Sequence, residues 1–416
     1  MSAAVSPTLR RLQRKVWKWV IDPYTTPPPA EQFGPYERGD FFRFTVLHRS
    51  RRSRARVGQL HTPHGVVNTP NFVAVGTNAA LKMVDQPRAN DAGLELMFCN
   101  TFHLMLQPGA DVVAAAGGLH RFMQRDRPLM TDSGGFQVFS LAHGSVYDEL
   151  NMKTRKRELE GRLLRVTEDG ATFRSYVDGR ILTLTPESSV QAQKALGADI
   201  IIPLDELPPY HIEPEALRRS VYLSHRWEAR SLQEHLRDVR QQAMYCVVHG
   251  GVDESLRRLS AEYLTALPFD GIGIGGSLGK DRQELIALLQ FLMPLLPADK
   301  PNHLLGIADM ESIEQAVPLG VDTFDSCYPT RLGRHGTLLT RSRGRVRIRS
   351  RQWERVFEPV DEGCGGFVSR HHTLAYLHHL WRAHEPLAAA LLTLHNIQYM
   401  CDEMRRLRER ILDDAL

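Results

Sequence analysis

Two aspartates lie in sequence contexts that suit catalysis. Asp132 occurs in Thr-Asp-Ser-Gly-Gly-Phe-Gln (131–137), and Asp325 occurs in Phe-Asp-Ser-Cys-Tyr-Pro-Thr-Arg (324–331). Each follows a short apolar run and precedes turn-forming residues, which predicts a carboxylate at the end of a buried strand. A carboxylate there can attack a substrate or transfer a proton. A single such Asp is also typical of a helix N-cap or a turn, so the catalytic interpretation requires several strand ends to meet at one site.

Other strand ends carry polar residues and glycines. Paired glycines let the backbone approach a planar or phosphate-bearing ligand closely and offer it N–H donors. One glycine pair is weak evidence because glycine also serves loops, but acids at three strand ends, a histidine and three glycine pairs together favour one shared site. The residues at these strand ends are Asn100, His103, Ser133, Gly134, Gly135, Asp205, Glu206, His249, Gly250, Gly251, Gly275 and Gly276.

Eight short apolar runs must supply the strands that position these side chains. Continuous apolar runs, rather than alternating ones, are typical of parallel strands that are buried on both faces. The runs are 71–75, 95–99, 128–131, 199–204, 244–248, 270–274, 303–307 and 321–324.

Helical segments separate most of these runs. One is predicted to begin at Thr185-Pro186-Glu187 and to end at Gly197, and others cover 280–294 and 310–319. Strands that alternate with helices predict an α/β fold, a (β/α)8 TIM barrel. The alternative is an open doubly wound sheet, but no Gly-x-Gly-x-x-Gly follows the first run.

Two segments depart from this alternation. Residues 148–184 are polar and charged, with strand-like pieces near 162–166, 172–177 and 181–185, which predicts an inserted β-hairpin or small sheet at the barrel mouth. Residues 1–40 form a basic N-terminal extension with no acid before Asp22, which is typical either of an organellar targeting peptide or of a basic helical appendage.

Arginines gather after the last run. Arg331 and Arg334 follow Asp325 closely, and six further arginines then recur at every second residue. On one strand this period would place all six on one face, as a stripe suited to a phosphate backbone. The alternative is a solvated edge that prevents aggregation. The six are Arg341, Arg343, Arg345, Arg347, Arg349 and Arg351, and a second cluster without a clear placement comprises Arg49, Arg51, Arg52, Arg54 and Arg56.

Composition narrows the class of protein further. The 416 residues are 42% apolar and 24% charged, with a formal net charge of only +4, which is typical of a globular protein and not of a polycation. The five cysteines are scattered and form no Cys-x-x-Cys pair, so a reducing compartment is expected. No apolar stretch approaches the roughly 20 residues that a bilayer requires, so no membrane association is expected.

Taken together, the motifs closely resemble those of the tRNA-guanine transglycosylases, also called queuine tRNA-ribosyltransferases. The resemblance predicts a domain of residues 41–410, which contains the 148–184 insertion and a C-terminal helical subdomain at 355–410. Besides the two aspartate motifs, it rests on Leu-Gly-Ala-Asp-Ile (196–200), Leu-Asp-Glu (204–206), His-Gly-Gly (249–251), Ile-Gly-Gly (274–276), Tyr-Leu-His-His-Leu (376–380) and His-Asn (395–396).

The resemblance implies a pentosyltransferase that replaces guanine at the wobble position of GUN-anticodon tRNAs with queuine or preQ1, which is the queuosine modification. It implies that Asp325 is the nucleophile on the ribose, giving a covalent RNA–enzyme intermediate, and that Asp132 is the general acid/base. The residues that it places around the base are Ser133, Gly134, Phe136 (often Tyr in the family), Asp205, His249 (usually Gln), Gly275, Gly276 and Leu305. Those that it places on the anticodon loop are Arg331 and Arg334.

The chain departs from the family at the zinc motif, Cys-x-Cys-x-x-Cys followed by a His. Cys364 and His395 match the first and last ligands, but Gly366 and Ser369 replace the other two cysteines. Two protein ligands are too few for a closed structural zinc site. We therefore expect weak or absent zinc, no cofactor for the chemistry, and a homodimer that is less secure than in the family, whose zinc region helps to form it.

Several alternatives remain at this point. The degenerate zinc motif raises the possibility of a non-catalytic tRNA-binding partner subunit, although both aspartates are present. A relative that acts on archaeosine positions or on DNA is a third possibility. A short turn at 275–279 and Leu207, where bacterial members often have Cys, favour queuine over preQ1 as the incoming base. A cytoplasmic protein is expected, with organelle targeting through residues 1–40 as the alternative.

Overall fold

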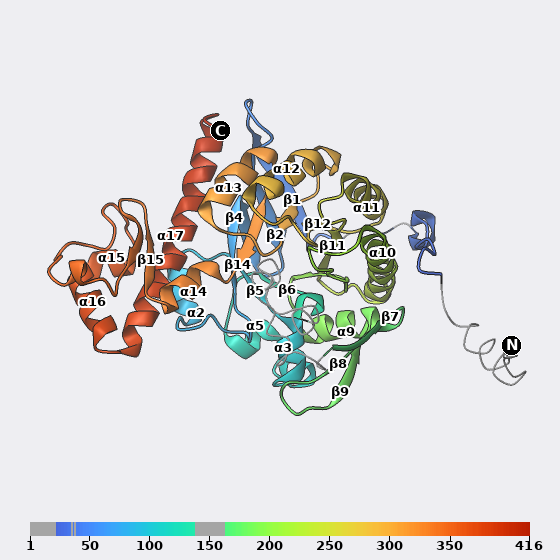
Figure 1. Cartoon of the computed structure of the whole chain (residues 1–416), viewed down its shortest axis with the longest axis horizontal. Coiled ribbons are helices and arrows are strands. Elements are labelled where there is room, and N and C mark those ends of the chain that lie inside the picture. The colour runs from blue at the N-terminus through green and yellow to red at the C-terminus, as the bar shows by residue number, and fades with distance from the viewer. Residues whose placement is uncertain (1–21, 35, 37–38, 138–162) are drawn as a thin grey trace, which may run out of the picture.

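A closed barrel of parallel strands forms the centre of the molecule. The computed structural model describes residues 22–34, 36, 39–137 and 163–416 (Figure 1). Within these residues, eight strands pair in the order β10-β11-β12-β13-β14-β4-β5-β6, which confirms the predicted TIM barrel and excludes the open doubly wound sheet. The strands are β4 (Asn71–Val75), β5 (Leu96–Cys99), β6 (Leu129–Thr131), β10 (Ile200–Ile201), β11 (Ala243–Val248), β12 (Gly271–Ile274), β13 (Asn302–Leu304) and β14 (Thr323–Ser326).

The barrel strands are apolar on both faces, which explains why their sequences read as continuous runs. Along β4, Phe72 and Ala74 belong to the cluster between strands and helices, whereas Val73 belongs to a second cluster with Phe98 and Tyr245. Successive side chains of a strand point to opposite faces, so one strand supplies both clusters. Both faces must exclude water, and polar residues are therefore displaced toward the strand ends.

Helices cover the outside of the barrel and begin at well-defined caps. Thr185 and Ser188 form a reciprocal capping box at the start of α9 (Pro186–Leu196), and Gly197 ends this helix with a φ of 72°. Asp281 caps α12 (Arg282–Leu292), and Asp309 caps α13 (Met310–Ala316). The predicted helices at 185–197, 280–294 and 310–319 are therefore confirmed, the last continuing as η4 (Val317–Leu319).

The remaining helices complete the outer layer and the C-terminal region (Figure 1). Among the described residues, no helix combines the length and apolar composition that a membrane crossing requires. These helices are η2 (Ala30–Phe33), α2 (Gln86–Asp91), α3 (Thr101–Leu106), α4 (Ala110–Ala115), α5 (Leu119–Met123), α10 (Pro214–Arg237), α11 (Glu254–Ala266), η3 (Met293–Leu295), α14 (Tyr328–Arg334), η5 (Arg351–Trp353), α15 (Phe367–His371), α16 (Leu374–Arg382) and α17 (Pro386–Leu412).

An antiparallel sheet precedes the barrel and packs on its amino-terminal end. Its strands are β1 (Arg43–Arg49), β2 (Arg56–Thr62) and β3 (Gly65–Thr69), which the sequence patterns did not single out. Leu60 and Val67 from this sheet join the same buried cluster as the barrel residue Val73, so the sheet closes that end of the barrel.

Part of the predicted N-terminal extension packs against the barrel helices. The backbone oxygen of Thr25 accepts a hydrogen bond from Arg226 in α10 at 2.8 Å, and the oxygen of Pro28 accepts one from Tyr263 in α11 at 2.9 Å. Residues 1–21, on which the targeting prediction falls, lie outside the described residues.

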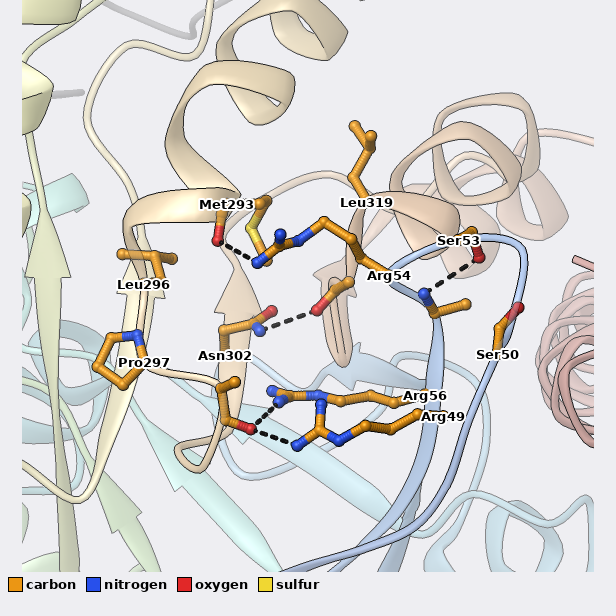
Figure 2. Close-up of a pocket in the computed structure, with 13 residues that line it drawn as sticks. Arg49, Ser50, Ser53, Arg54, Arg56, Met293, Leu296, Pro297, Asn302 and Leu319 are labelled. Carbon is orange, nitrogen blue, oxygen red and sulfur yellow. Dashed lines mark hydrogen bonds between the residues drawn. The ribbon is translucent and has the colours of Figure 1, made fainter.

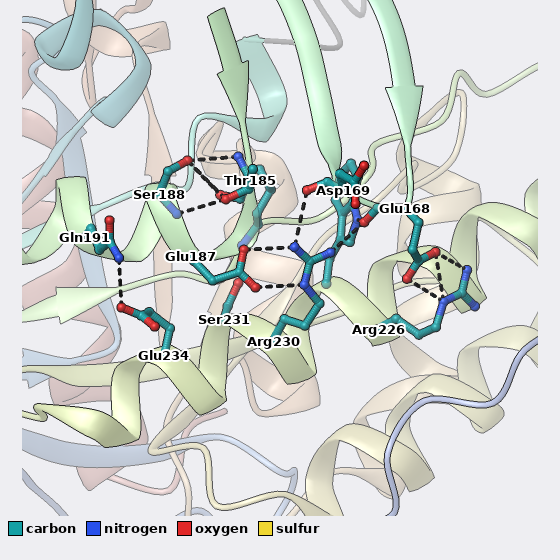
Figure 3. A network of polar contacts seen from close by, with 12 residues as sticks. Glu168, Asp169, Thr185, Glu187, Ser188, Gln191, Arg226, Arg230, Ser231 and Glu234 are labelled. Atoms are coloured by element: carbon teal, nitrogen blue, oxygen red, sulfur yellow. Dashed lines mark hydrogen bonds and ion pairs between the residues drawn. The ribbon is translucent and has the colours of Figure 1, made fainter. Parts of the chain in front are cut away.

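The insertion forms a three-stranded antiparallel sheet, β7 (Leu163–Thr167), β8 (Gly170–Arg174) and β9 (Ile181–Leu184), close to the strand-like pieces that the sequence predicts. Two arginines of α10 anchor this region (Figure 3). Arg226 pairs with the side chain of Glu168 at 2.8 Å. Arg230 donates to the backbone oxygens of Glu168 and Asp169 and also pairs with Glu187 of α9 at 2.8 Å. Residues 148–162 of the predicted insertion lie outside the described residues.

The predicted single stripe of six arginines is wrong. Within residues 341–351, only Arg345 and Arg347 lie in a strand, β16 (Gly344–Arg347), which pairs with β15 (Thr337–Thr340). Arg341 and Arg343 lie in the preceding turn, where they pair with Glu403 and Glu358. The turn at 341–343 precedes the strand and the 3-10 helix η5 follows it, so the six arginines do not share one strand face.

Candidate active site

Both aspartates lie at the carboxyl-terminal end of the barrel. Asp132 directly follows β6, and Asp325 is the third residue of β14. The two carboxyls are close enough for the charge of Asp325 to raise the pKa of Asp132, and Asp132 has the same effect on Asp205, which follows β10. The fold therefore brings the three strand-end acids together, as the catalytic interpretation required.

Asp325 is held by one of its two oxygens. Oδ1 accepts hydrogen bonds from the backbone N–H of Gly306 at 2.7 Å and from Nε2 of His303 at 3.1 Å. An ionised carboxylate only accepts hydrogen bonds, so Nε2 of His303 carries a proton in this pair. Oδ2 receives no hydrogen bond from the described residues. The carboxylate is thus oriented while one oxygen remains available for attack on a substrate carbon.

Asp132 is buried within a ring of donors. Oδ2 accepts from the side-chain amides of Asn100 at 2.6 Å and Gln137 at 2.9 Å, and Oδ1 accepts from the backbone N–H of Thr101 at 2.7 Å. Burial raises the pKa of Asp132, these hydrogen bonds oppose the rise, and the charge of Asp325 adds to it. The net upward shift suits a group that must hold a proton and then release it.

Asp205 faces a histidine and a second buried acid. Nε2 of His249 lies 3.5 Å from Oδ2 of Asp205 and 3.3 Å from Oε1 of Glu228. Burial, with the charges of Asp132 and Glu206 added, raises the pKa of Asp205 to about 7. At neutral pH this carboxyl is therefore poised between its neutral and ionised forms.

Glycines at this end permit close backbone approach. A Cβ added to Gly135 would lie 2.7 Å from the backbone oxygen of Asp205, and one added to Gly275 would lie 2.5 Å from the side chain of Val247 and 3.0 Å from that of Leu305. Both positions are tighter than real Cβ contacts allow, so only glycine fits. This accounts for two of the glycine pairs seen in the sequence.

A buried arginine joins the loops that follow β11 and β12. The guanidinium of Arg257 in α11 donates to the backbone oxygens of Val248, Gly251, Gly275 and Ser277 at 2.7 to 2.9 Å. Burial lowers the pKa of Arg257 to about 9. These bonds fix the His-Gly-Gly and Gly-Gly loops relative to one another.

The other predicted base-site residues also lie at this end. Ser133 donates to Oδ1 of Asp205 at 3.4 Å, and Gly134 packs near Phe102 and Leu184. The side chain of Phe136 is 47% exposed at this end of the barrel. An aromatic ring is the kind of group that stacks on a planar base.

The two predicted RNA-binding arginines lie on α14, directly after the Asp325 strand. Arg331 is exposed and Arg334 is half-buried. Gly333 between them packs against the backbone of Thr393 in α17, where a Cβ would lie 2.7 Å away. The helix is therefore held on α17 while Arg331 faces solvent beside the mouth.

The residues at the predicted zinc position do not fit a zinc site. The thiol of Cys364 contacts the carboxylate of Asp402 at 3.8 Å, and Nε2 of His395 lies 2.8 Å from the backbone oxygen of Leu339. That hydrogen bond requires Nε2 to carry a proton, so Nδ1, which has no hydrogen-bond partner among the described residues, is the only ring nitrogen of His395 that could bind a metal. In the part of the chain that the structure describes, neither residue belongs to a cluster of three potential ligands. No step of the chemistry is therefore assigned to a metal.

A pocket of about 260 Å³ lies at the opposite, amino-terminal end of the barrel (Figure 2). Its arginines donate hydrogen bonds to backbone oxygens. Arg49 and Arg56 donate to the oxygen of Ala298, and Arg54 donates to the oxygen of Met293. Arg56 also forms a bidentate pair with Asp322 at 2.6 and 2.8 Å. The second arginine cluster of the sequence is thus placed away from the aspartate site, and these members hold the fold together.

Sequence reasoning missed His303, Glu228 and Arg257. His303 lies inside an apolar strand run, where a polar residue is itself a signal. Glu228 and Arg257 lie on helices that look amphipathic, and a charged residue there is normally exposed. Only the packing of α10 and α11 on the barrel brings these two beneath the strand ends.

A closed parallel barrel with three acids at its carboxyl-terminal mouth is the arrangement of a TIM-barrel enzyme. A family model described as "Queuine tRNA-ribosyltransferase" matches residues 51–416. The queuine tRNA-ribosyltransferase of Protochlamydia amoebophila (strain UWE25) is 55% identical over 376 residues, covering 90% of this chain and 97% of that protein. Those of Chlamydia muridarum and Chlamydia caviae are 47% and 46% identical over 375 residues, covering 90% of this chain and 99% of each. The chain therefore belongs to the queuine tRNA-ribosyltransferase family and is a transferase.

Proposed function

We propose that this protein replaces guanine at the wobble position of GUN-anticodon tRNAs with queuine, through a covalent bond between Asp325 and the ribose. The observation that carries the proposal is the asymmetric setting of Asp325, in which Gly306 and His303 hold Oδ1 and Oδ2 is left for attack. The similarity to queuine tRNA-ribosyltransferases over most of the chain supports the substrate class.

In the first half-reaction, Oδ2 of Asp325 attacks C1′ of the ribose and the bond from C1′ to N9 of guanine breaks. The carbocation-like sugar is trapped by the carboxylate, as in retaining glycosidases. Asp132, whose raised pKa favours the protonated form, gives its proton to the departing base. The products are an ester between the RNA ribose and Asp325, neutral guanine and an ionised Asp132.

The second half-reaction reverses these steps with the incoming base. Ionised Asp132 removes the proton from the nitrogen of that base, the nitrogen attacks C1′, and Asp325 leaves as a carboxylate. No oxidant, reductant or cofactor is needed for this exchange, and the proposal includes no zinc. The donors around Asp132 stay in place through both halves, because Asn100, Thr101 and Gln137 bind its oxygens in either direction.

The base is recognised by a carboxylate on one edge and by hydrogen-bond donors on the other. Ionised Asp205 accepts from the N–H groups of the base, Gly275, Gly276 and His249 face its carbonyl edge, and Phe136 stacks on its ring. The base must leave the anticodon stack to reach this site, which is least costly in a single-stranded loop. Arg331 and Arg334 hold the phosphates of that loop.

The proposal also covers the incoming base, the cellular compartment and the oligomeric state. Leu207, half-buried just beyond Asp205, gives the pocket an apolar wall that suits queuine better than the smaller preQ1. We place the enzyme in the cytoplasm, as a homodimer. Sedimentation of the purified protein tests the homodimer directly.

The test is incubation with a GUN-anticodon tRNA and radiolabelled guanine, repeated with queuine and with preQ1 as competitors. Incorporation that queuine suppresses more strongly than preQ1 is the expected result. Stronger suppression by preQ1 would overturn the choice of base, and tRNA binding without any incorporation would overturn catalysis in favour of a silent tRNA-binding subunit.

A further inference from the structure

A glutamate that the mechanism does not use lies buried beside the base-reading residues. Glu228 belongs to α10 and is 0% exposed. Its Oε2 accepts the backbone N–H of Val247 at 2.9 Å, and its Oε1 lies 3.3 Å from Nε2 of His249. Oε1 makes no other hydrogen bond with the described residues. A buried acid is costly unless it is neutral or paired, so its position beside His249 requires an explanation.

His249 has one nitrogen facing the acids and one facing the base-reading loop. Its side chain is 2% exposed, and Nε2 lies toward Glu228 and Asp205. Nδ1 has no hydrogen-bond partner among the described residues, and a Cβ added to Gly276 would lie 3.4 Å from it. The two nitrogens of a neutral imidazole differ, since one donates and the other accepts. The position of the imidazole proton therefore decides whether Nδ1 offers the bound base a hydrogen-bond donor or an acceptor.

Burial and hydrogen bonding indicate which atoms of Glu228 and His249 carry protons. Burial raises the pKa of Glu228 well above its ordinary value and lowers the pKa of His249 well below its own, so a neutral acid beside a neutral imidazole is favoured over an ion pair. Oε2 of Glu228 is occupied by the N–H of Val247, which leaves Oε1 to carry the proton. A proton on Oε1 can be donated to Nε2 of His249, 3.3 Å away, which leaves the imidazole proton on Nδ1.

We propose that Glu228 is a positioning residue that fixes His249 as the Nδ1–H tautomer, so that His249 donates to the carbonyl oxygen of the bound base. The inference rests on the proposed function, and it explains how the base pocket obtains a hydrogen-bond donor at His249. Because Nε2 is then an acceptor occupied by Glu228, Asp205 is free to accept from the N–H groups of the base. The pocket thus combines a carboxylate with donors, which complements a 2-amino-6-oxo purine edge.

This arrangement predicts a pH dependence of base affinity. When Glu228 loses its proton it can only accept, so the imidazole proton moves to Nε2 and Nδ1 turns its lone pair toward the base carbonyl. The KM for the base should therefore rise at alkaline pH. The titratable and charged groups that face the pair are Asp205 after β10, Cys246 in β11, His225 on α10, and Arg257 and Tyr263 on α11.

Two substitutions distinguish the effect of the proton on Glu228 from the effect of the shape of its side chain. In Glu228→Gln, the amide can donate to His249 and accept from Val247 but cannot ionise, so the base KM should match wild type at neutral pH and stay flat at alkaline pH. In Glu228→Leu the donor is lost, and the base KM should lie about tenfold above the neutral wild-type value at every pH, the effect of one hydrogen bond, with kcat within about twofold. Glu215→Gln, an exposed position on the same helix, is the matched control.

The tautomer can also be read without turnover. In protein with ¹⁵N-labelled histidine, the signal that disappears in His249→Gln should report Nδ1–H at neutral pH in wild type and should lose this preference in Glu228→Leu. An Nε2–H signal in neutral wild type, an unchanged base KM in Glu228→Leu, or an alkaline rise in Glu228→Gln would each overturn the proposal. Absence of base exchange by wild type would instead overturn the proposed function, and the NMR result would still decide the tautomer.

Discussion

The two ends of the barrel use the same residue types for opposite purposes, and β10 shows this within one short segment. Asp199 precedes the strand and Asp205 follows it. Asp199 accepts from His64 at 2.7 Å and lies 3.2 Å from His120, and these partners lower its pKa to about 2 against the opposing effect of burial. Asp205 has only weak partners, and burial raises its pKa to about 7.

The same contrast holds along β14. Asp322, just before the strand, is bound on both oxygens by Arg56. Asp325, within the strand, leaves one oxygen without a partner among the described residues. Asp199 and Asp322 at the amino-terminal end are thus paired and stabilise the fold, whereas Asp205 and Asp325 at the carboxyl-terminal end are held more weakly and can react. Barrel enzymes in general separate stability and catalysis in this way.

The largest expected effect is on catalysis at Asp325. Asp325→Ala should lower base exchange by at least about 10⁴-fold and abolish the covalent RNA adduct, because no other group can trap the sugar. Denaturing gels with labelled tRNA measure the adduct, and filter binding should show that tRNA affinity is retained. Guanine turnover near the wild-type rate would rule out Asp325 as the nucleophile.

The matching substitution at the other end of β14 should act on stability instead. Asp322→Ala leaves Arg56 as a buried, unpaired charge, which should lower the free energy of unfolding by about 3–5 kcal/mol. Denaturant unfolding measures this loss, and the folded fraction should keep its specific activity. Asp238→Ala, which breaks an exposed pair with Arg240, should leave stability nearly unchanged. Equal losses in both variants would contradict the comparison.

Asp205 should govern the acid side of the pH profile. In the proposed function the ionised form reads the base, so kcat/KM for guanine should rise with pH up to about 7, the pKa of Asp205, before the alkaline decline expected from ionisation of Glu228. Asp205→Asn should remove this dependence and weaken base binding by about 10- to 100-fold, the effect of losing charged hydrogen bonds. An acid limb that survives in the variant would assign the titration to another group.

The contribution of Asp199 to the free energy of unfolding should depend on pH within a defined range. Its pKa falls from 3.8 in the unfolded chain to about 2 in the folded one, so it contributes about 2 kcal/mol that is present above pH 3.8 and lost as the pH falls through about 2. His64 has a raised pKa, so its contribution is present below 6.5 and is lost as the pH rises above that value. Unfolding of wild type and Asp199→Asn as a function of pH measures both. A difference that persists undiminished at the acid end would refute the assignment.

The smallest effect is expected at the rim of the mouth. Arg331→Ala should raise the KM for tRNA several-fold and reduce the salt slope of tRNA binding by about one, since one phosphate contact is lost. Arg349→Ala, an exposed arginine of the interrupted stripe, is the control and should leave both unchanged. Equal effects from the two positions would mean that the whole basic surface, rather than α14, holds the RNA.

Much of this architecture could be predicted from local patterns. The eight barrel strands fall within a few residues of the predicted runs, because a strand that is buried on both faces must be continuously apolar. The capped start of α9 was equally visible, since its cap depends only on Thr185 and the residues that follow. The placement of Asp132, Asp205 and Asp325 at one mouth then follows from parallel strands, whose carboxyl ends all face the same way.

The arginine repeat shows where such reasoning fails. Its period of two was real, but Glu358 and Glu403, distant in the sequence, hold Arg343 and Arg341 in a turn. The antiparallel sheet β1–β3 was missed for a related reason, because its burial depends on the barrel end that it covers. In both cases the structure depends on partners that are distant in the sequence.

The sequence by itself determined the order of strands and helices and which acids reach the barrel mouth, since both depend on burial patterns along the chain. Only the tertiary structure decided what each acid does. Glu228 meets His249, Arg56 meets Asp322, and Oδ2 of Asp325 stays available through contacts between segments far apart in the chain. Charge, tautomer and reactivity are set by the partners that a buried group finds, and those partners are fixed only when the barrel closes.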